Sequence, residues 1–124
     1  MITAIRLWND DSGASHVEHG RIDLAPDTAR SLAVRATDTV FAETRIGHAL
    51  AWHTAPRRQY VITLTGVLDF ATRDGESFRL QPGIVLVAED TVGTGHRWEF
   101  VGGEPWRRMY VGIADGTHSG FVAD

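Results

Sequence analysis

The amino-acid sequence predicts an all-β fold, either a sandwich or a barrel. Apolar residues recur mainly with a period of two, which is the spacing of side chains along one face of a strand. The apolar stretches are short, and Gly, Pro, Asp or Asn bounds each of them at intervals of about 8–12 residues. Only residues 26–33 suit a short helical turn, because Pro26 could open it and Asp27 would favour its N-terminal end.

Nine segments carry the strand pattern, namely residues 2–8, 16–24, 35–46, 58–65, 67–73, 77–80, 83–89, 96–102 and 106–113. The third is rich in β-branched and aromatic residues, which favour strands. The Asp74-Gly75 pair between the fifth and sixth segments predicts a hairpin with a type I′ turn, whose backbone needs positive φ angles. No repeat or linker interrupts the pattern, and single domains cluster at roughly 100–150 residues. We therefore expect one domain over residues 1–124.

The composition is that of an ordinary globular protein, with 43% hydrophobic and 23% charged residues. No apolar run approaches the roughly 20 residues that cross a bilayer. Residues 1–11 lack the basic and apolar regions of a signal peptide. The chain has no cysteine, which excludes disulfides and thiolate zinc sites and is compatible with a reducing compartment. We therefore expect a cytoplasmic protein without membrane partners.

The charged residues exclude several kinds of partner and chemistry. The net charge is −4 and the arginines are scattered, so the clustered positive charge of a nucleic-acid-binding surface is missing. All twelve basic residues are arginine, and without lysine there can be no Schiff-base chemistry. Any bound anion must be held by arginine, histidine or backbone amides. Nucleic acid is therefore not an expected partner.

In the stretch from His53 to Thr65, the odd or even number of a residue predicts the face of the strand on which its side chain lies. If it is largely extended, the odd positions share one face, and that face carries His53, Ala55, Arg57, Gln59, Val61, Thr63 and Thr65. The even face carries Arg58, Tyr60, Ile62 and Leu64. Both faces contain apolar bulk, as expected of a strand that lines a cavity on one side and packs on the other. Pro56 interrupts the ladder of hydrogen bonds and weakens the parity across it.

Residues 47–66 resemble the first motif of the cupin superfamily. That motif is a glycine, five residues, His-x-His, three or four residues, a glutamate, six residues and a glycine. Gly47 and His53 have the first spacing, and six residues separate Gln59 from Gly66. Two positions depart from the motif, because Ala55 stands where the second histidine falls and Gln59 stands in place of the glutamate.

Residues 82–96 resemble the second cupin motif, which begins at Pro82-Gly83 and ends at His96 after two more residues than usual. The resemblance covers roughly residues 40–112 and is closest to small single-domain bacterial cupins. It implies a double-stranded β-helix, a jelly roll whose narrow interior holds the site. It also implies a homodimer, for which exposed N-terminal strands would supply the edge.

The two motifs suggest residues for catalysis and for metal binding. The catalytic candidates are His53, His96 and Glu89, because imidazole and carboxylate groups transfer protons. The candidate metal ligands are His53, His96 and Gln59, with Glu89 as a carboxylate ligand if its loop turns inward. The metal would be Fe, Mn, Ni or Zn. We interpret Asp90 and Thr91 as turn residues.

Four residues near His53 are candidates for binding a ligand. They are Gln59, Arg57, Trp52 and Tyr60. Arg57 shares the parity of His53 and could clamp a carboxylate, whereas Trp52 and Tyr60 suit the core better than they suit stacking on a ligand. We expect Arg107-Arg108 to lie at the surface or at an interface.

Three functions remain open at this point. The first is an isomerase, lyase or oxygenase that uses His53 and His96 in the barrel, and the second is a metal-free cupin that only binds a small polar or anionic metabolite. The third is a structural dimer without a ligand. The resemblance does not choose among them, because cupins carry many different reactions.

Overall fold

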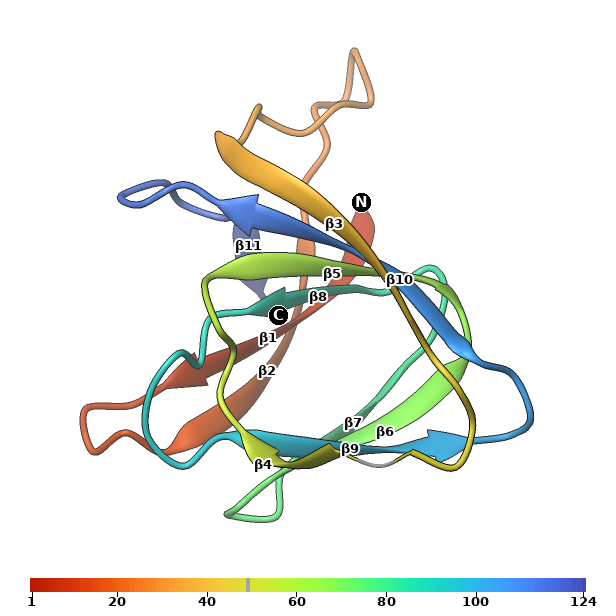
Figure 1. Cartoon of the computed structure of the whole chain (residues 1–124). Helices are drawn as coiled ribbons and strands as arrows, with labels where there is room; N and C mark the ends of the chain where they lie inside the picture. Colours follow the sequence, from red (N-terminus) through yellow and green to blue (C-terminus); the bar gives the residue numbers. More distant parts are fainter. Residues whose placement is uncertain (49) are drawn as a thin grey trace.

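The computed structural model describes residues 1–48 and 50–124, and the regular elements in them are all β-strands (Figure 1). In chain order these are β1 Ile2–Asn9, β2 Ser15–Ile22, β3 Ala36–Thr44, β4 Leu50–His53, β5 Gln59–Thr65, β6 Val67–Thr72, β7 Ser77–Leu80, β8 Val85–Ala88, β9 His96–Val101, β10 Trp106–Ile113 and β11 Phe121–Ala123. They form a sheet of seven strands and a sheet of four strands that face each other as a sandwich. The all-β prediction is confirmed.

The strand order is that of a jelly roll. Strands β3 to β10 run β3-β10-β5-β8 in one sheet and β4-β9-β6-β7 in the other. Antiparallel pairs join β3 to β10, β4 to β9, β5 to β8 and β6 to β7, so the segment is one long hairpin wound into two sheets. This winding is the double-stranded β-helix that the sequence motifs imply.

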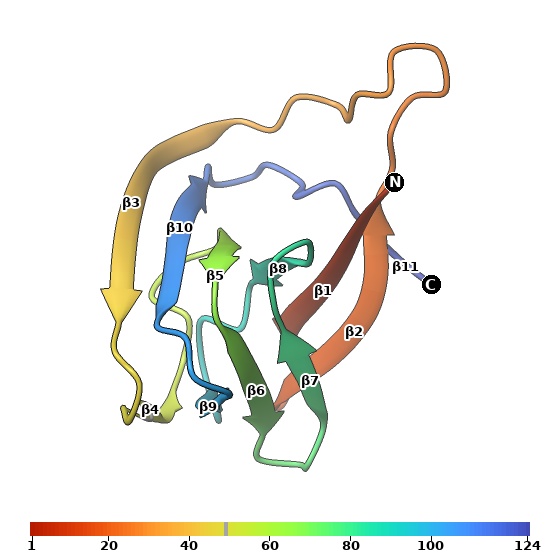
Figure 2. The ribbon, with the colours of Figure 1, turned by 90° about the vertical axis from the view of Figure 1, so that its right-hand side faces the viewer.

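Three further strands widen the larger sheet beyond β8. β1 lies parallel to β8, β2 pairs with β1 and β11 pairs with β2, which gives the order β11-β2-β1-β8-β5-β10-β3. The edges of this sheet are therefore β11 and β3 (Figure 2). The part of the chain that the structure describes contains no helix that is long and apolar enough to cross a membrane.

The core lies between the two sheets because alternate residues of each strand point inward. The burial of β5 and β6 alternates along the strand, as period-two apolar patterns predict. Four leucines are completely or almost completely buried at the centre, namely Leu7, Leu68, Leu80 and Leu86. A smaller apolar cluster of Ala4, Val87, Ile113 and Phe121 lies on the outer side of the larger sheet.

Two local expectations need correction. Residues 26–33 form no helix, because a single turn closed by the Ala29 N–H and the Ala25 carbonyl (2.8 Å) ends at Ala29 in the left-handed region, with φ of 55°. The Asp74-Gly75 hairpin exists, but only Gly75 has a positive φ angle, and the Gly75 N–H donates to the Thr72 carbonyl. This is a three-residue loop with glycine in the left-handed position, and not a type I′ turn.

Candidate functional site

A cavity of about 420 Å³ lies between the two sheets. Its wall is mainly apolar and aromatic, with Val40, Ala55, Pro56, Val61, Phe70, Leu86, Ala88, Trp98, Trp106 and Tyr110. The polar residues in the wall are His53, Arg57, Gln59, His96 and Arg108. The structure thus brings together four residues that the sequence analysis singled out, from the strands β4, β5 and β9 and the loop before β5.

His96 and Asp90 form a buried pair on one side of the cavity. His96 begins β9, and its exposed fraction is 4%, whereas Asp90 is completely buried. Nδ1 of His96 donates to Oδ2 of Asp90 (2.5 Å), and the Ser15 hydroxyl donates to the same oxygen (2.8 Å). The Asp90 contact fixes the proton of a neutral His96 on Nδ1 and leaves Nε2 as the free nitrogen. Oδ1 of Asp90 is buried and has no hydrogen-bond partner among the described residues.

His53 faces His96 across the β4–β9 pair. The two residues are direct partners in the strand register, and their ring centroids are 4.5 Å apart. Nδ1 of His53 donates to the Ala51 carbonyl (3.0 Å), which again leaves Nε2 free. Burial lowers the pKa of His53 and the neighbouring His96 lowers it further, against the opposing effect of the Ala51 hydrogen bond. Two imidazoles therefore lie together, each tied through Nδ1.

Arg57, in the loop before β5, and Gln59, the first residue of β5, continue the polar side of the cavity. Nε of Arg57 donates to Oε1 of Gln59 (3.2 Å), and its Nη1 forms an ion pair with Asp38 on β3. The guanidinium lies over Gly112, where a Cβ atom would be only 2.7 Å from Nη1. The charge of Arg57 is thus already balanced by a carboxylate.

Arg108 is a buried cation in the cavity wall. Its exposed fraction is 8%, and its guanidinium stacks on the Trp106 ring with Cζ 3.9 Å from the ring centroid. Nε donates to the Tyr110 hydroxyl (2.8 Å), and Nη1 donates to the Thr44 hydroxyl (2.8 Å) and the Trp106 carbonyl (3.1 Å). All these acceptors are neutral. Among the described residues, no carboxylate forms an ion pair with Arg108, and nothing accepts from its Nη2.

The donors in the cavity do not suit a resident transition metal. Such sites generally use at least three good nitrogen, sulfur or carboxylate ligands. Nε2 of His53 and Nε2 of His96 supply two, but the Gln59 oxygen already accepts from the cationic Arg57, and Ala55 offers no donor. In the described part of the chain, the group of three whose donor atoms lie within 4.8 Å of one another is elsewhere, at His16, Asp74 and Glu76.

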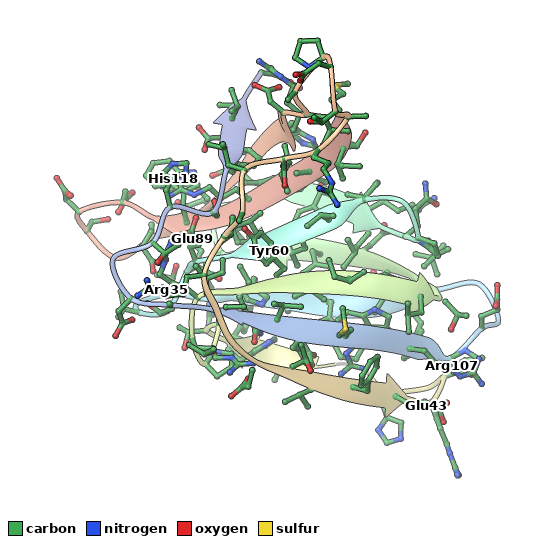
Figure 3. The ribbon with its side chains drawn as sticks, turned by 90° about the horizontal axis from the view of Figure 1, so that it is seen from above. Arg35, Glu43, Tyr60, Glu89, Arg107 and His118 are labelled. Atoms are coloured by element: carbon green, nitrogen blue, oxygen red, sulfur yellow. The ribbon has the colours of Figure 1, made fainter. Side chains whose placement is uncertain are left out.

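Three predicted site residues lie outside the cavity. Figure 3 shows Tyr60 and Glu89 on the outer side of the seven-stranded sheet. Glu89 follows β8 with outward parity and accepts hydrogen bonds from Arg6 and Arg58 (both 2.7 Å). Burial alone would raise the pKa of Glu89, but these two arginines lower it overall.

Tyr60 has the outward parity that its even position predicts, and its hydroxyl donates to the Ser119 carbonyl. Trp52 lies on the outer face of the smaller sheet, where Cζ of Arg73 and Cζ of Arg97 are 4.3 and 5.2 Å from the centroid of its ring. Neither side chain reaches the cavity, because each alternates away from its inward neighbours.

Two residues of the site, Arg108 in the cavity wall and Asp90 behind His96, lie where the sequence did not predict them. Asp90 was interpreted as a turn residue, although it is two positions beyond the inward Ala88. Arg108 was expected at the surface or at an interface, but it lines the cavity between the inward Trp106 and Tyr110, while the adjacent Arg107 is exposed and pairs with Glu43. The signal that could have found both was strand parity, which applies to charged residues as it does to apolar ones.

Comparisons with known proteins give structural similarity but no match to a family model. No protein-family model matches the chain, and no curated protein matches it significantly. A crystal structure of a cupin-2 domain containing protein from Shewanella frigidimarina is similar over 67% of this chain and 81% of that protein, with a TM-score of 0.47 and 20% identity. The jelly-roll assignment itself rests on the strand order described above.

Proposed function

We propose that the protein binds a small organic anion, a carboxylate with an apolar body, in the cavity between the sheets and without a resident metal. The observation that carries this proposal is Arg108, a buried cation without a carboxylate partner among the described residues. A buried charge is unfavourable unless an opposite charge or strong hydrogen bonds compensate it. A ligand carboxylate that accepts from Nη2 would supply the missing charge.

The rest of the cavity fits the apolar part of such a ligand. Its volume of about 420 Å³ lies within the range of roughly 300–1,000 Å³ that is usual for small-molecule sites. The aromatic rings of Phe70 and Trp98 offer flat apolar surface, while Gln59, His53 and His96 supply polar contacts. Arg57 contributes less to the attraction of an anion because Asp38 already neutralises it.

The test is calorimetry, in which carboxylic acids and their matched uncharged amides are titrated separately into the protein and their affinities are compared. We expect monocarboxylates with an aromatic or branched apolar body to bind at least tenfold more tightly than the matched amides, a difference of about 1.4 kcal/mol. Arg108→Gln should remove this preference, and Arg108→Lys should retain part of it. Arg107→Gln is the matched control, because Arg107 is the exposed neighbour on the other face of β10.

Equal affinity for acids and amides would contradict the proposal, as would an unchanged preference in Arg108→Gln. Thermal unfolding of each variant separates loss of binding from loss of the fold.

The paired histidines favour a second candidate function, proton transfer on the bound acid. Both Nδ1 atoms are engaged, so both Nε2 atoms can accept a proton, and Asp90 would stabilise the imidazolium that forms on His96. One imidazole would remove a proton from the carbon next to the carboxylate, and the same or the other imidazole would return it.

Deuterium exchange at that carbon in heavy water, followed by NMR, tests this chemistry directly. We expect exchange in the parent protein, and we expect its loss in His96→Gln, with binding retained. If no bound acid exchanges its proton, the protein binds its ligand without this chemistry.

A further inference from the structure

β3 is the long unpaired edge of the larger sheet. It spans nine residues, Ala36–Thr44, and pairs on one side only, with β10 (Figure 2). The other sheet edges in the described part of the chain are much shorter, because β11 has three residues and β4 and β7 have four each. A long edge strand offers a row of free N–H and C=O groups to another strand.

The usual means of protecting such an edge are largely missing from β3. It contains neither proline nor lysine, and Phe41 is 70% exposed. The two acidic residues of β3 could repel another strand. Each is already neutralised by an arginine of its own chain, Asp38 by Arg57 and Glu43 by Arg107. Figure 3 shows Glu43 and Arg107 close together at this edge. Only the register shift near its first residues, opposite Val111 and Ile113, interrupts the strand.

We infer that β3 pairs antiparallel with β3 of a second copy, about a two-fold axis at Phe41. Directly opposed residues of an antiparallel pair lie on the same face of the sheet, so one residue must lie opposite its own copy, with the axis midway between the two. At Phe41 the register places Phe41 against the partner's Phe41, Val40 against the partner's Ala42 and Thr39 against the partner's Glu43. An axis at Ala42 would instead oppose Phe41 to a charged Glu43, and an axis at Val40 would run into the irregular start of the strand.

The contact also covers the rim of the cavity. Val40 lines the cavity and yet is 49% exposed, which places β3 at its open side. A second β3 beside it would bury Val40 and narrow the opening. The exposed area of the chain is consistent with a missing contact, because 7042 Å² exceeds the roughly 6,600 Å² expected for a compact monomer of 13.6 kDa.

Light scattering on two charge variants tests the surface. We expect the parent chain to be a dimer, Phe41→Lys to be a folded monomer and Val122→Lys to remain a dimer. Val122 is the matched control because it is an exposed apolar residue on β11, at the opposite edge of the same sheet. A monomeric parent would overturn the inference. A dimer that dissociates in Val122→Lys and not in Phe41→Lys would place the contact at β11, and that would also overturn the inference.

Single cysteines test the register, since the chain has none of its own. Opposed residues have Cα atoms about 4.5–5.5 Å apart, which is within disulfide range. Cysteine at position 39 would be four residues from its copy, or roughly 13 Å along the strand. Phe41→Cys should therefore cross-link on oxidation, whereas Thr39→Cys and Glu43→Cys should not. Efficient cross-linking only at either control position would contradict an axis at Phe41.

Tryptophan quenching tests whether the contact narrows the opening, and it needs no ligand. Trp98 and Trp106 line the cavity, so Trp8→Phe with Trp52→Phe leaves only these two as reporters. Acrylamide should quench them more strongly in monomeric Phe41→Lys than in the dimer. Equal quenching would show that the partner leaves the cavity open. The result is independent of the proposed carboxylate ligand, whose failure would leave the dimer contact standing.

Discussion

Gly95 holds the loop before β9 against the backbone of His53, and its replacement by alanine should damage the site more than its conformation alone predicts. Its φ angle is 74°, and a Cβ atom there would lie 2.4 Å from the carbonyl oxygen of His53 and 2.7 Å from its carbonyl carbon. Both atoms belong to the backbone, so no side-chain rotation can relieve the contact. The β4–β9 pair must separate where His53 and His96 meet.

The magnitude follows from two contributions. The left-handed conformation costs an alanine roughly 1–2 kcal/mol. Separation of the strands would lose one or two backbone hydrogen bonds, at about 1 kcal/mol each. Gly95→Ala should therefore destabilise the protein by about 2–4 kcal/mol. Gly75→Ala is the matched control, because Gly75 has a φ angle of 86° and no atom within 4 Å of the added Cβ. It should show only the conformational contribution.

Urea unfolding at neutral pH, monitored by tryptophan fluorescence, measures the difference in stability between the two variants. We expect Gly95→Ala to be the less stable of the two by about 1–2 kcal/mol, the contribution of the lost hydrogen bonds. The His53 resonances should also shift in Gly95→Ala and not in Gly75→Ala. Equal losses of stability, with His53 undisturbed, would refute the view that Gly95 is needed for this close approach.

Three further predictions concern titration and burial. His16 donates to the carboxylates of Asp10 and Glu76, and these hydrogen bonds raise its pKa. The stability that this histidine contributes is therefore complete below pH 6.5 and is lost as the pH rises through its folded pKa. The stability gap between the parent and His16→Gln, measured in urea, should therefore shrink as the pH is raised above 6.5. Burial lowers the pKa of His53, so NMR should show its ring titrating below pH 6.5. Ser15→Ala removes a donor to the buried Asp90 and should lower the free energy of unfolding by about 1.5–3 kcal/mol, whereas an unchanged urea midpoint would contradict this.

The fold could be predicted from local patterns because a jelly roll is built from short strands and turns. Nine strands were expected from alternation, and the two that were missed, β4 and β11, are only four and three residues long. The pairing of β1 with β8 could not be predicted, because nothing in either segment specifies a partner some 80 residues away. That pairing depends on how the whole chain packs.

Strand parity correctly predicts the site residues of the stretch from His53 to Thr65. The expectation that a charged residue is exposed fails for Arg108. The odd positions from His53 to Gln59 do reach one cavity, even across Pro56. Arg108 was expected at the surface or at an interface, where most arginines lie. Its burial depends on Trp106 and Tyr110, whose rings and hydroxyl surround the guanidinium in three dimensions.

The parallel pairing of β1 with β8 also sets the order in which the protein can be completed during synthesis. Ile5 and Leu7 leave the ribosome some 80 residues before β8, the strand that pairs with the second edge of β1 and ends at Ala88. At 5–20 residues per second, the intervening 80 residues or so take roughly 4–16 s to make. Throughout that time two of the most buried side chains of the finished core stay unprotected.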